Sequence, residues 1–174
     1  GHKGPFLERV LENLPGKKKP AIITVANQSV INIKTLGTFQ VFAGNEEISQ
    51  ERWVSTKARD MLAYFITFRG ERIPADRVFD SIWAEKGGRG LTAFHTALSR
   101  LRSALKTGEN SPRLILVEAG DYRIDAARFT IDVDEFDSAL AKARASTDDE
   151  ATARFYEQAI NLYKGEYLQN FYYD

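Results

Sequence analysis

The hydrophobic positions of residues 91–106 recur with the period of an α-helix. Spacings of four, three and four residues separate the members of one apolar stripe, which is formed by Phe94, Leu98, Leu101 and Leu105. This spacing places the stripe on one side of an amphipathic helix and leaves polar residues on the other. After a short gap, residues 113–124 predict two strands joined by a turn near Gly120. The pattern therefore predicts a helix followed at once by a hairpin.

The same periodicity predicts two helices before this one. Residues 56–69 form the first, which ends at Gly70 and has a buried face made by Ala58, Met61, Leu62, Phe65 and Ile66. Pro74 opens the second, over residues 75–85. Residues 31–48 are rich in β-formers and predict strands, with a bend or bulge at Gly37.

Beyond Phe129 the pattern becomes Ala-rich and helical. Residues 132–145 and 148–164 predict two helices, the second opened by a capping box of Thr147 and Glu150. A pair of this kind is typical of tetratricopeptide repeats. One pair cannot bury both of its apolar faces, so it packs on the preceding domain or belongs to a longer array.

Residues 1–30 are predicted to lie outside the folded domains. Gly1-His2 is typical of the residue left by tag cleavage, and residues 5–13 predict a short helix. Pro15-Gly16 ends that helix, and three lysines followed by Pro20 predict a linker. A phosphate contact is the alternative for these lysines.

Composition narrows the class of protein. The 174 residues are 43% hydrophobic, which is enough for one or two small domains, and they include no cysteine. Disulfides and thiolate zinc sites are therefore excluded, and a reducing cytoplasm is the expected location. No apolar run approaches the roughly 20 residues of a membrane span, and we expect no membrane association.

The net charge of zero conceals an uneven distribution. Residues 52–128 carry 14 basic and 9 acidic side chains, a net charge of +5, whereas residues 129–174 carry 4 and 10, a net charge of −6. An acidic end repels phosphates, so contact with DNA is expected on the middle segment. The alternative is the ordinary variation in charge between small domains.

Signals for catalysis or metal binding are poor. The chain has two histidines, too few for a cluster, and His95 is expected to be a surface or DNA-facing residue. The acids from Asp132 to Asp137 fail the register of a calcium loop, because Asp137 stands where such a loop needs glycine. We predict a protein that is not an enzyme and has no metal and no cofactor.

For DNA binding the helix of residues 91–106 has suitable chemistry. Its polar face offers Thr92, His95, Thr96, Ser99, Arg100, Arg102 and Lys106. Arginine can pair with guanine, and hydroxyl and imidazole groups can reach base edges or phosphates. A solvated helix face is the alternative, but three helices followed by a hairpin favour DNA.

Two segments of the chain resemble known protein families. Residues 33–125 resemble the OmpR/PhoB-type winged helix in the form found in Streptomyces antibiotic regulatory proteins. The carrying motifs are Leu36-Gly37-Thr38-Phe39-Gln40-Val41, Trp53, Lys57-Ala58-Arg59, Ile82-Trp83, Leu98-Ser99-Arg100-Leu101-Arg102 and Gly120-x-Tyr122-Arg123. The tail resembles the bacterial transcriptional activator domain, through Asp132-Val133-Asp134-Glu135-Phe136 and Leu162-Tyr163-Lys164-Gly165-Glu166-Tyr167-Leu168.

The resemblance implies a four-stranded N-terminal sheet and a recognition helix, residues 91–106, in the major groove. It implies a wing around Tyr122 and Arg123 in the minor groove, and a Trp83 indole that donates to a phosphate. For Trp83 a half-buried core position is the alternative. The loop with Lys86, Gly87, Gly88, Arg89 and Gly90 lies where the family contacts RNA polymerase. Direct repeats of DNA and a homodimer on them are also implied.

The chain departs from the family pattern at two positions. Ser99 stands where many members have arginine, so base preference does not transfer, and Asp121 weakens the positive potential of the wing.

Together these features predict an α+β protein. Its winged helix-turn-helix, with an N-terminal antiparallel sheet, spans residues 31–128, and an incomplete helical activator domain spans residues 129–174. The predicted function is sequence-specific DNA binding by a bacterial transcriptional activator. With about five or six phosphate contacts, the logarithm of affinity should fall against log salt with a slope near −5. A protein-interaction module that never touches DNA is the alternative.

Overall fold

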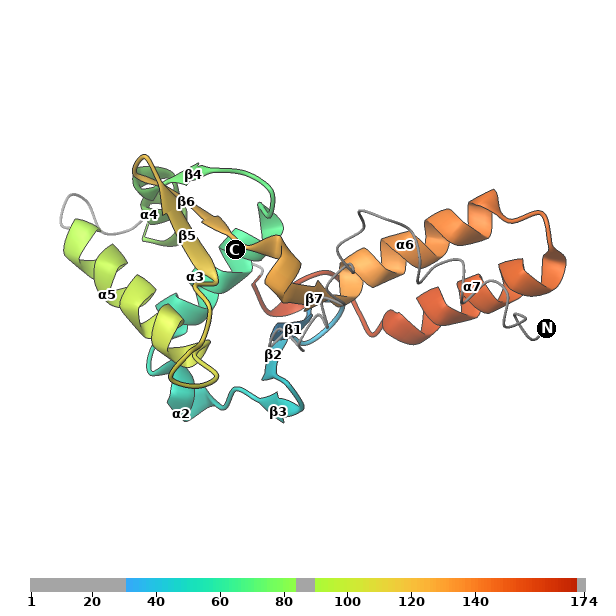
Figure 1. Cartoon of the computed structure of the whole chain (residues 1–174), viewed down its shortest axis with the longest axis horizontal. Coiled ribbons are helices and arrows are strands. Elements are labelled where there is room, and N and C mark those ends of the chain that lie inside the picture. The colour runs from blue at the N-terminus through green and yellow to red at the C-terminus, as the bar shows by residue number, and fades with distance from the viewer. Residues whose placement is uncertain (1–30, 84–89, 172–174) are drawn as a thin grey trace, which may run out of the picture.

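The computed structural model describes residues 31–83 and 90–171 of the chain. The predicted short helix, the linker and Lys86, Gly87, Gly88 and Arg89 lie outside these residues. Figure 1 shows a compact part that ends with β7, and two helices side by side that project away from it. This arrangement confirms the predicted α+β organisation, with a sheet near the beginning and helices near the end.

The first sheet has four strands in the order β3-β2-β1-β7. They are β1 (Ile31–Lys34), β2 (Gln40–Ala43), β3 (Glu46–Glu47) and β7 (Phe129–Ile131). The first three pair antiparallel, but β7 pairs parallel with β1. The prediction of an antiparallel sheet is therefore wrong for its fourth strand. A parallel neighbour needs a long crossover, and here the helices and the second sheet provide it.

Four helices follow the first hairpin: α2 (Gln50–Trp53), α3 (Thr56–Thr67), α4 (Ala75–Ile82) and α5 (Gly90–Ala104). The predicted apolar faces are confirmed, because all five stripe residues of α3 and all four of the 91–106 segment are buried. Helix α5 ends at Ala104, so Lys106 follows the helix instead of belonging to its last turn. The stripe of α5 joins a core shared with α3 and the sheets.

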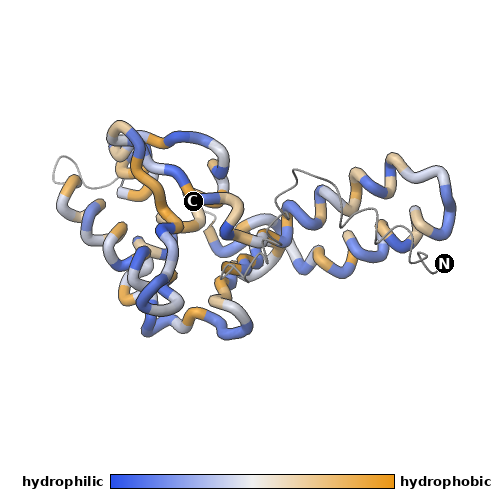
Figure 2. The backbone as a smooth tube through the Cα atoms, in the orientation of Figure 1, coloured by the Kyte–Doolittle hydropathy of each residue, from blue (hydrophilic) through white to orange (hydrophobic). Residues whose placement is uncertain are grey.

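A second sheet lies beside these helices, with strand order β4-β6-β5. It consists of β4 (Ile73–Pro74), β5 (Ile115–Glu118) and β6 (Asp121–Ile124). The predicted hairpin is confirmed, and its two-residue loop places Ala119 at φ 53° and Gly120 at φ 92°. Positive φ at both positions matches the twist of a tight hairpin. Figure 2 shows β5 mostly in the colour of hydrophobic residues where it lies over the helices.

The helical pair consists of α6 (Asp132–Ala145) and α7 (Asp149–Leu162), close to the predicted bounds. Two 3-10 turns, η1 (Ala126–Arg128) and η2 (Gln169–Phe171), precede β7 and follow α7. The capping prediction is wrong by one residue: Asp148 is the N-cap, and its Oδ1 accepts from the Ala151 N–H at 2.6 Å. A carboxylate in that position satisfies the free amide, so Thr147 has no capping role.

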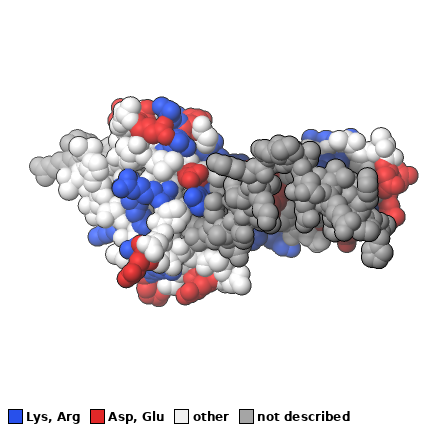
Figure 3. All heavy atoms as spheres, in the orientation of Figure 1, with Lys and Arg blue, Asp and Glu red and all other residues white. Residues whose placement is uncertain are grey.

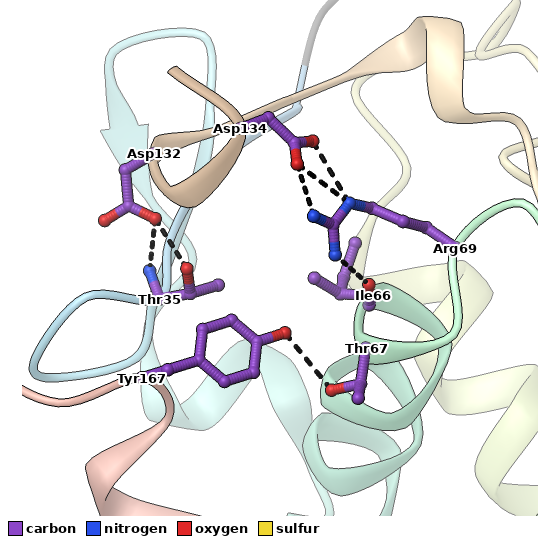
Figure 4. A network of polar contacts seen from close by, with 7 residues as sticks. All are labelled: Thr35, Ile66, Thr67, Arg69, Asp132, Asp134 and Tyr167. Atoms are coloured by element: carbon purple, nitrogen blue, oxygen red, sulfur yellow. Dashed lines mark hydrogen bonds and ion pairs between the residues drawn. The ribbon is translucent and has the colours of Figure 1, made fainter. Parts of the chain in front are cut away.

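The helical pair is anchored to the first sheet at its base, where α6 begins. Asp132 is 2% exposed, and its Oδ1 accepts from the backbone N–H and the hydroxyl of Thr35, both at 2.7 Å. Its Oδ2 accepts from the Leu36 N–H at 3.1 Å. Figure 4 shows Asp132 and Thr35 pointing toward each other. Since each contact goes to the donors that follow β1, the buried carboxylate fixes where α6 leaves the sheet.

Further contacts surround this anchor. Arg69, just beyond α3, pairs with both carboxylate oxygens of Asp134, and the Tyr167 hydroxyl lies 3.2 Å from that of Thr67 (Figure 4). The chain after α7 returns to the sheet, where the Gly37 N–H donates to the Glu166 carbonyl at 3.0 Å. Gly37 has φ 104°, and a Cβ there would meet the Lys164 carbonyl oxygen at 3.1 Å. The predicted bend at Gly37 is confirmed, and glycine permits this close approach.

We call this region the joint; it comprises Thr35, Leu36, Gly37, Thr67, Arg69, Asp132, Asp134, Glu166 and Tyr167. It shows that the helical pair packs on the preceding part at its base. Helix α7 and its C-cap residue expose three large apolar side chains at helical spacing, namely Tyr156, Ile160 and Tyr163.

Candidate nucleic-acid interface

Helix α5 presents the polar face that its sequence pattern predicts. One side is buried through the apolar stripe together with Ala97 and Ala104. The other side is exposed and carries Thr92, His95, Thr96, Ser99, Arg100 and Arg102, followed beyond the helix by exposed Lys106. The structure therefore gathers these seven predicted site residues on one accessible surface. Contact of this surface with DNA remains a prediction.

Cations without carboxylate partners gather at the C-terminal end of α5. Among the described residues, the side chains of Arg100, Lys106 and Arg113 make no ion pair. The Arg102 guanidinium donates at 3.4 Å to the neutral Ile115 carbonyl, and it too makes no ion pair within the described residues. We call Arg100, Arg102, Lys106 and Arg113 the α5 cation cluster. Unpaired cations of this kind attract anions.

A hollow of about 170 Å³ separates the end of α5 from the start of β5. Three cations of the α5 cation cluster line this hollow together with apolar residues and one serine. The lining residues are Arg102, Leu105, Lys106, Ser111, Pro112, Arg113, Leu114 and Ile115. From the far side, the Arg52 guanidinium donates to the Lys106 carbonyl and so satisfies a backbone acceptor just beyond α5. The cluster is therefore held on a packed surface.

The β5–β6 hairpin also carries arginine, but there the charge is compensated. The Arg123 guanidinium donates to Glu118 Oε1 at 2.6 Å, and Arg72 lies 2.7 Å from Glu118 Oε2. The hydrogen bond from Arg123, with the attraction of both guanidiniums, holds the pKa of Glu118 below its usual range. Figure 3 shows this difference: red and blue spheres mix at the top of the compact part, over the hairpin turn, whereas blue spheres gather below it.

Two aromatic residues of the predicted site lie mostly in the core. Tyr122 is 7% exposed and packs edge-on against Phe94, with ring centroids 5.0 Å apart. Trp83 is also 7% exposed and stacks on Phe79 at 5.3 Å. For Trp83 the core position is thus confirmed, and its contact with phosphate remains a prediction. Tyr122 thus links the hairpin to α5, and Trp83 packs on α4 with the Lys57 ammonium of α3 above its ring.

The predicted polymerase-contact loop falls almost wholly outside the described residues. Lys86, Gly87, Gly88 and Arg89 belong to the range 84–89, and Gly90 is the first residue of α5. The structure tests no contact of this loop.

Sequence reasoning missed three residues of this surface. Arg113 was treated only as the start of the hairpin, although it completes the α5 cation cluster. The predicted site also omits Glu118 and Arg72. The signal for Glu118 was present: a two-residue turn at Ala119-Gly120 makes Glu118 and Arg123 diagonal neighbours across the hairpin, within reach of long side chains.

Comparison with solved structures shows a likeness in fold. The chain superposes on the structure of EmbR from Mycobacterium tuberculosis, solved in complex with a low-affinity phosphopeptide, with a TM-score of 0.67 and 21% sequence identity. The match covers 80% of this chain and 38% of EmbR, so the chain spans well under half the length of that protein. No family model and no curated protein matches the sequence. Among the described residues, no helix is long and apolar enough to cross a membrane. The fold of most of this chain is therefore similar to that of a part of EmbR.

Proposed function

We propose that the chain is the DNA-binding part of a bacterial transcriptional activator. The order α3, α4, α5 and then the β5–β6 hairpin is that of a winged helix-turn-helix, with α5 as recognition helix and the hairpin as wing. Residues 31–128 form this unit, and residues 129–174 begin a tetratricopeptide-like activator domain. Strand β7 joins the two, because it lies in the first sheet and leads directly into α6. The likeness to EmbR supports the fold on which this proposal rests.

One observation carries the proposal: the exposed face of α5 combines hydrogen-bonding side chains with cations that form no ion pair with any carboxylate in the described part of the chain. Unpaired cations at a surface attract phosphates, and their neutralisation releases counterions from DNA. In the proposed complex Thr92, His95, Thr96 and Ser99 meet base edges, whereas Arg100, Arg102, Lys106 and Arg113 meet phosphates. Tyr122 and Arg123 lie at the minor groove with the wing, and Trp83 lies near the backbone.

The partners follow from the same proposal. The DNA is double-stranded and carries direct repeats, and a second copy of the chain binds the neighbouring repeat. RNA polymerase binds the loop of residues 86–90. We place the protein in the bacterial cytoplasm, without an enzymatic activity and without a cofactor.

The proposal is tested by selecting genomic DNA fragments with the full-length protein and measuring their affinity by fluorescence anisotropy. We expect one family of fragments with a repeated motif to be enriched. The double variant Arg100→Ala, Arg102→Ala should lose at least tenfold in affinity at about 0.1 M salt, since two phosphate-range cations are removed. Arg144→Ala is the matched control, because Arg144 is an exposed cation on α6 and far from α5 in sequence.

A second candidate function is a protein-interaction module that never touches DNA. The exposed apolar stripe of α7, in particular Ile160 at 71% exposure, favours it. If no DNA fragment binds in a salt-dependent way, the DNA proposal fails and this second function takes its place.

A further inference from the structure

We propose that Glu118 competes with DNA phosphates for the two arginines of the wing and thereby limits its contribution to DNA affinity. This inference rests on the proposed function, and it concerns the strength of binding, not its occurrence. It assigns to Glu118 the place that a backbone phosphate takes when the protein binds DNA.

The geometry of the carboxylate supports this role. Oε1 of Glu118 accepts from Arg123 Nη2 at 2.6 Å and from Nε at 3.1 Å, while Oε2 lies 2.7 Å from Arg72 Nη2. Each oxygen therefore serves a different guanidinium, as two oxygens of one phosphate can. A guanidinium that is bound side-on by a carboxylate has the arrangement with which it binds phosphate.

The register of the second sheet explains why these three residues meet. Along β6, Tyr122 and Ile124 point into the core, so Arg123 points to the outer face. Glu118 is a diagonal neighbour of Arg123 across the hairpin, and Arg72 directly precedes the edge strand β4, which pairs with β6. The outer face of the wing thus brings two cations and one acid together at its turn.

This arrangement is accessible and exchangeable. Glu118 and Arg123 are each 36% exposed as side chains, and Arg72 is 62% exposed. Ion pairs at this exposure contribute little net free energy, because water solvates both partners well. A DNA phosphate can therefore replace Glu118 without a large loss of stability. Since the guanidiniums hold the pKa of Glu118 below its usual range, the competing carboxylate stays charged at neutral and mildly acidic pH.

The salt dependence of DNA binding distinguishes competition by Glu118 from a purely structural role of this residue. A cation that neutralises a phosphate releases counterions and steepens the salt slope by about 0.9. When a wing arginine leaves Glu118 for a phosphate, the freed carboxylate lies close to the DNA backbone. Repulsion between this carboxylate and the phosphates opposes the affinity gained from the arginine. Removal of the carboxylate charge should therefore raise the affinity and steepen the slope together.

The experiment compares Glu118→Gln with wild type by fluorescence anisotropy on the selected duplex and on an unrelated duplex, from 50 to 300 mM salt. We expect Glu118→Gln to bind both duplexes about tenfold more tightly at about 0.1 M salt, with a slope steeper by 1 to 2. Asp121→Asn is the matched control: it removes one negative charge from the same turn, and the Asp121 carboxylate makes no ion pair among the described residues. It should change affinity less than threefold.

A third variant identifies the groups that Glu118 restrains. Adding Arg72→Ala and Arg123→Ala to Glu118→Gln should return the slope to the wild-type value, which loss of a merely structural contact would not do. The inference is overturned if wild type binds DNA and Glu118→Gln binds no more tightly than Asp121→Asn. If neither wild type nor Glu118→Gln binds any duplex, the proposed function fails as well.

Discussion

The joint and the end of α5 both hold several charged side chains, but they use them in opposite ways. At the joint, the carboxylate oxygens of Asp132 accept from Thr35 and Leu36, which follow β1, and those of Asp134 accept from Arg69. At the end of α5, Arg100, Lys106 and Arg113 have no carboxylate partner among the described residues. Charges satisfied within the chain stabilise its fold, whereas charges left unmatched at the surface remain available to a ligand. The wing is intermediate, because its arginines are paired with Glu118 but remain exposed to a ligand.

The largest expected effect is at the joint. Asp132→Ala leaves the Thr35 N–H, the Thr35 hydroxyl and the Leu36 N–H without their acceptor in a buried place. We expect a loss of about 3 kcal/mol in the free energy of unfolding, because an unsatisfied buried donor costs about 1–3 kcal/mol. Thermal unfolding should show a fall in Tm of about 6–12 °C for a chain of this size.

Glu135→Ala is the control for this change, since Glu135 is an exposed acid in the same first turn of α6. It should lower Tm by no more than about 2 °C. Equal effects of the two substitutions would contradict the role of Asp132 as a buried anchor.

Single changes in the α5 cation cluster come next. Arg100→Ala and Arg113→Ala should each weaken DNA binding about eightfold at 0.1 M salt and reduce the salt slope by about 0.9. Neither should change Tm noticeably, because both side chains are exposed and make no ion pair within residues 31–83 and 90–171. Anisotropy titrations beside melting curves test both statements. A large loss of stability without a change in slope would show that these cations belong to the fold.

A smaller effect is expected where α3 and α6 meet. Asp134→Asn removes the carboxylate charge that pairs with Arg69, whose side chain is 26% exposed, while that of Asp134 is 48% exposed. A half-exposed pair contributes about 0.5–1 kcal/mol, so Tm should fall by about 1–4 °C. The salt slope of DNA binding should stay at the wild-type value. A change in that slope would mean that the joint is part of the DNA interface.

The smallest effect is expected for Arg123→Ala in the wing. Its charge is already matched by Glu118, so DNA affinity should change less than threefold. The same titrations measure it, with Arg100→Ala as the contrasting case. A loss as large as that of Arg100→Ala would remove the distinction between matched and unmatched arginines.

Local patterns predicted most of the elements. The apolar stripe of α5 specified which side of the helix is buried, and alternation with a two-residue turn specified the β5–β6 hairpin. The bounds of α6 agree with those predicted, because Ile131 ends a strand and a run of acids begins the helix.

Features that depend on distant partners were not predicted. Strand β7 has three residues, too few for a periodic signal, and its place beside β1 is set by pairing with residues about 98 positions earlier, as Ile31 with Phe129. The burial of Asp132 depends on donors near Thr35 in the same way. Side-chain charge alone also did not show which arginines are compensated. For Tyr122 and Trp83 the resemblance predicts contacts with DNA, but it does not indicate that both rings are also 7% exposed and mostly buried.

The salt dependence of DNA binding by one copy of the chain tests the central claim most directly. Four cations, Arg100, Arg102, Lys106 and Arg113, are free to neutralise phosphates, and the wing arginines are largely compensated. The logarithm of affinity for a duplex with a single repeat should therefore fall against log salt with a slope of about −3.6, shallower than the −5 expected from sequence. Replacement of all four by alanine should bring the slope close to zero. A slope that the fourfold variant leaves unchanged would contradict the account.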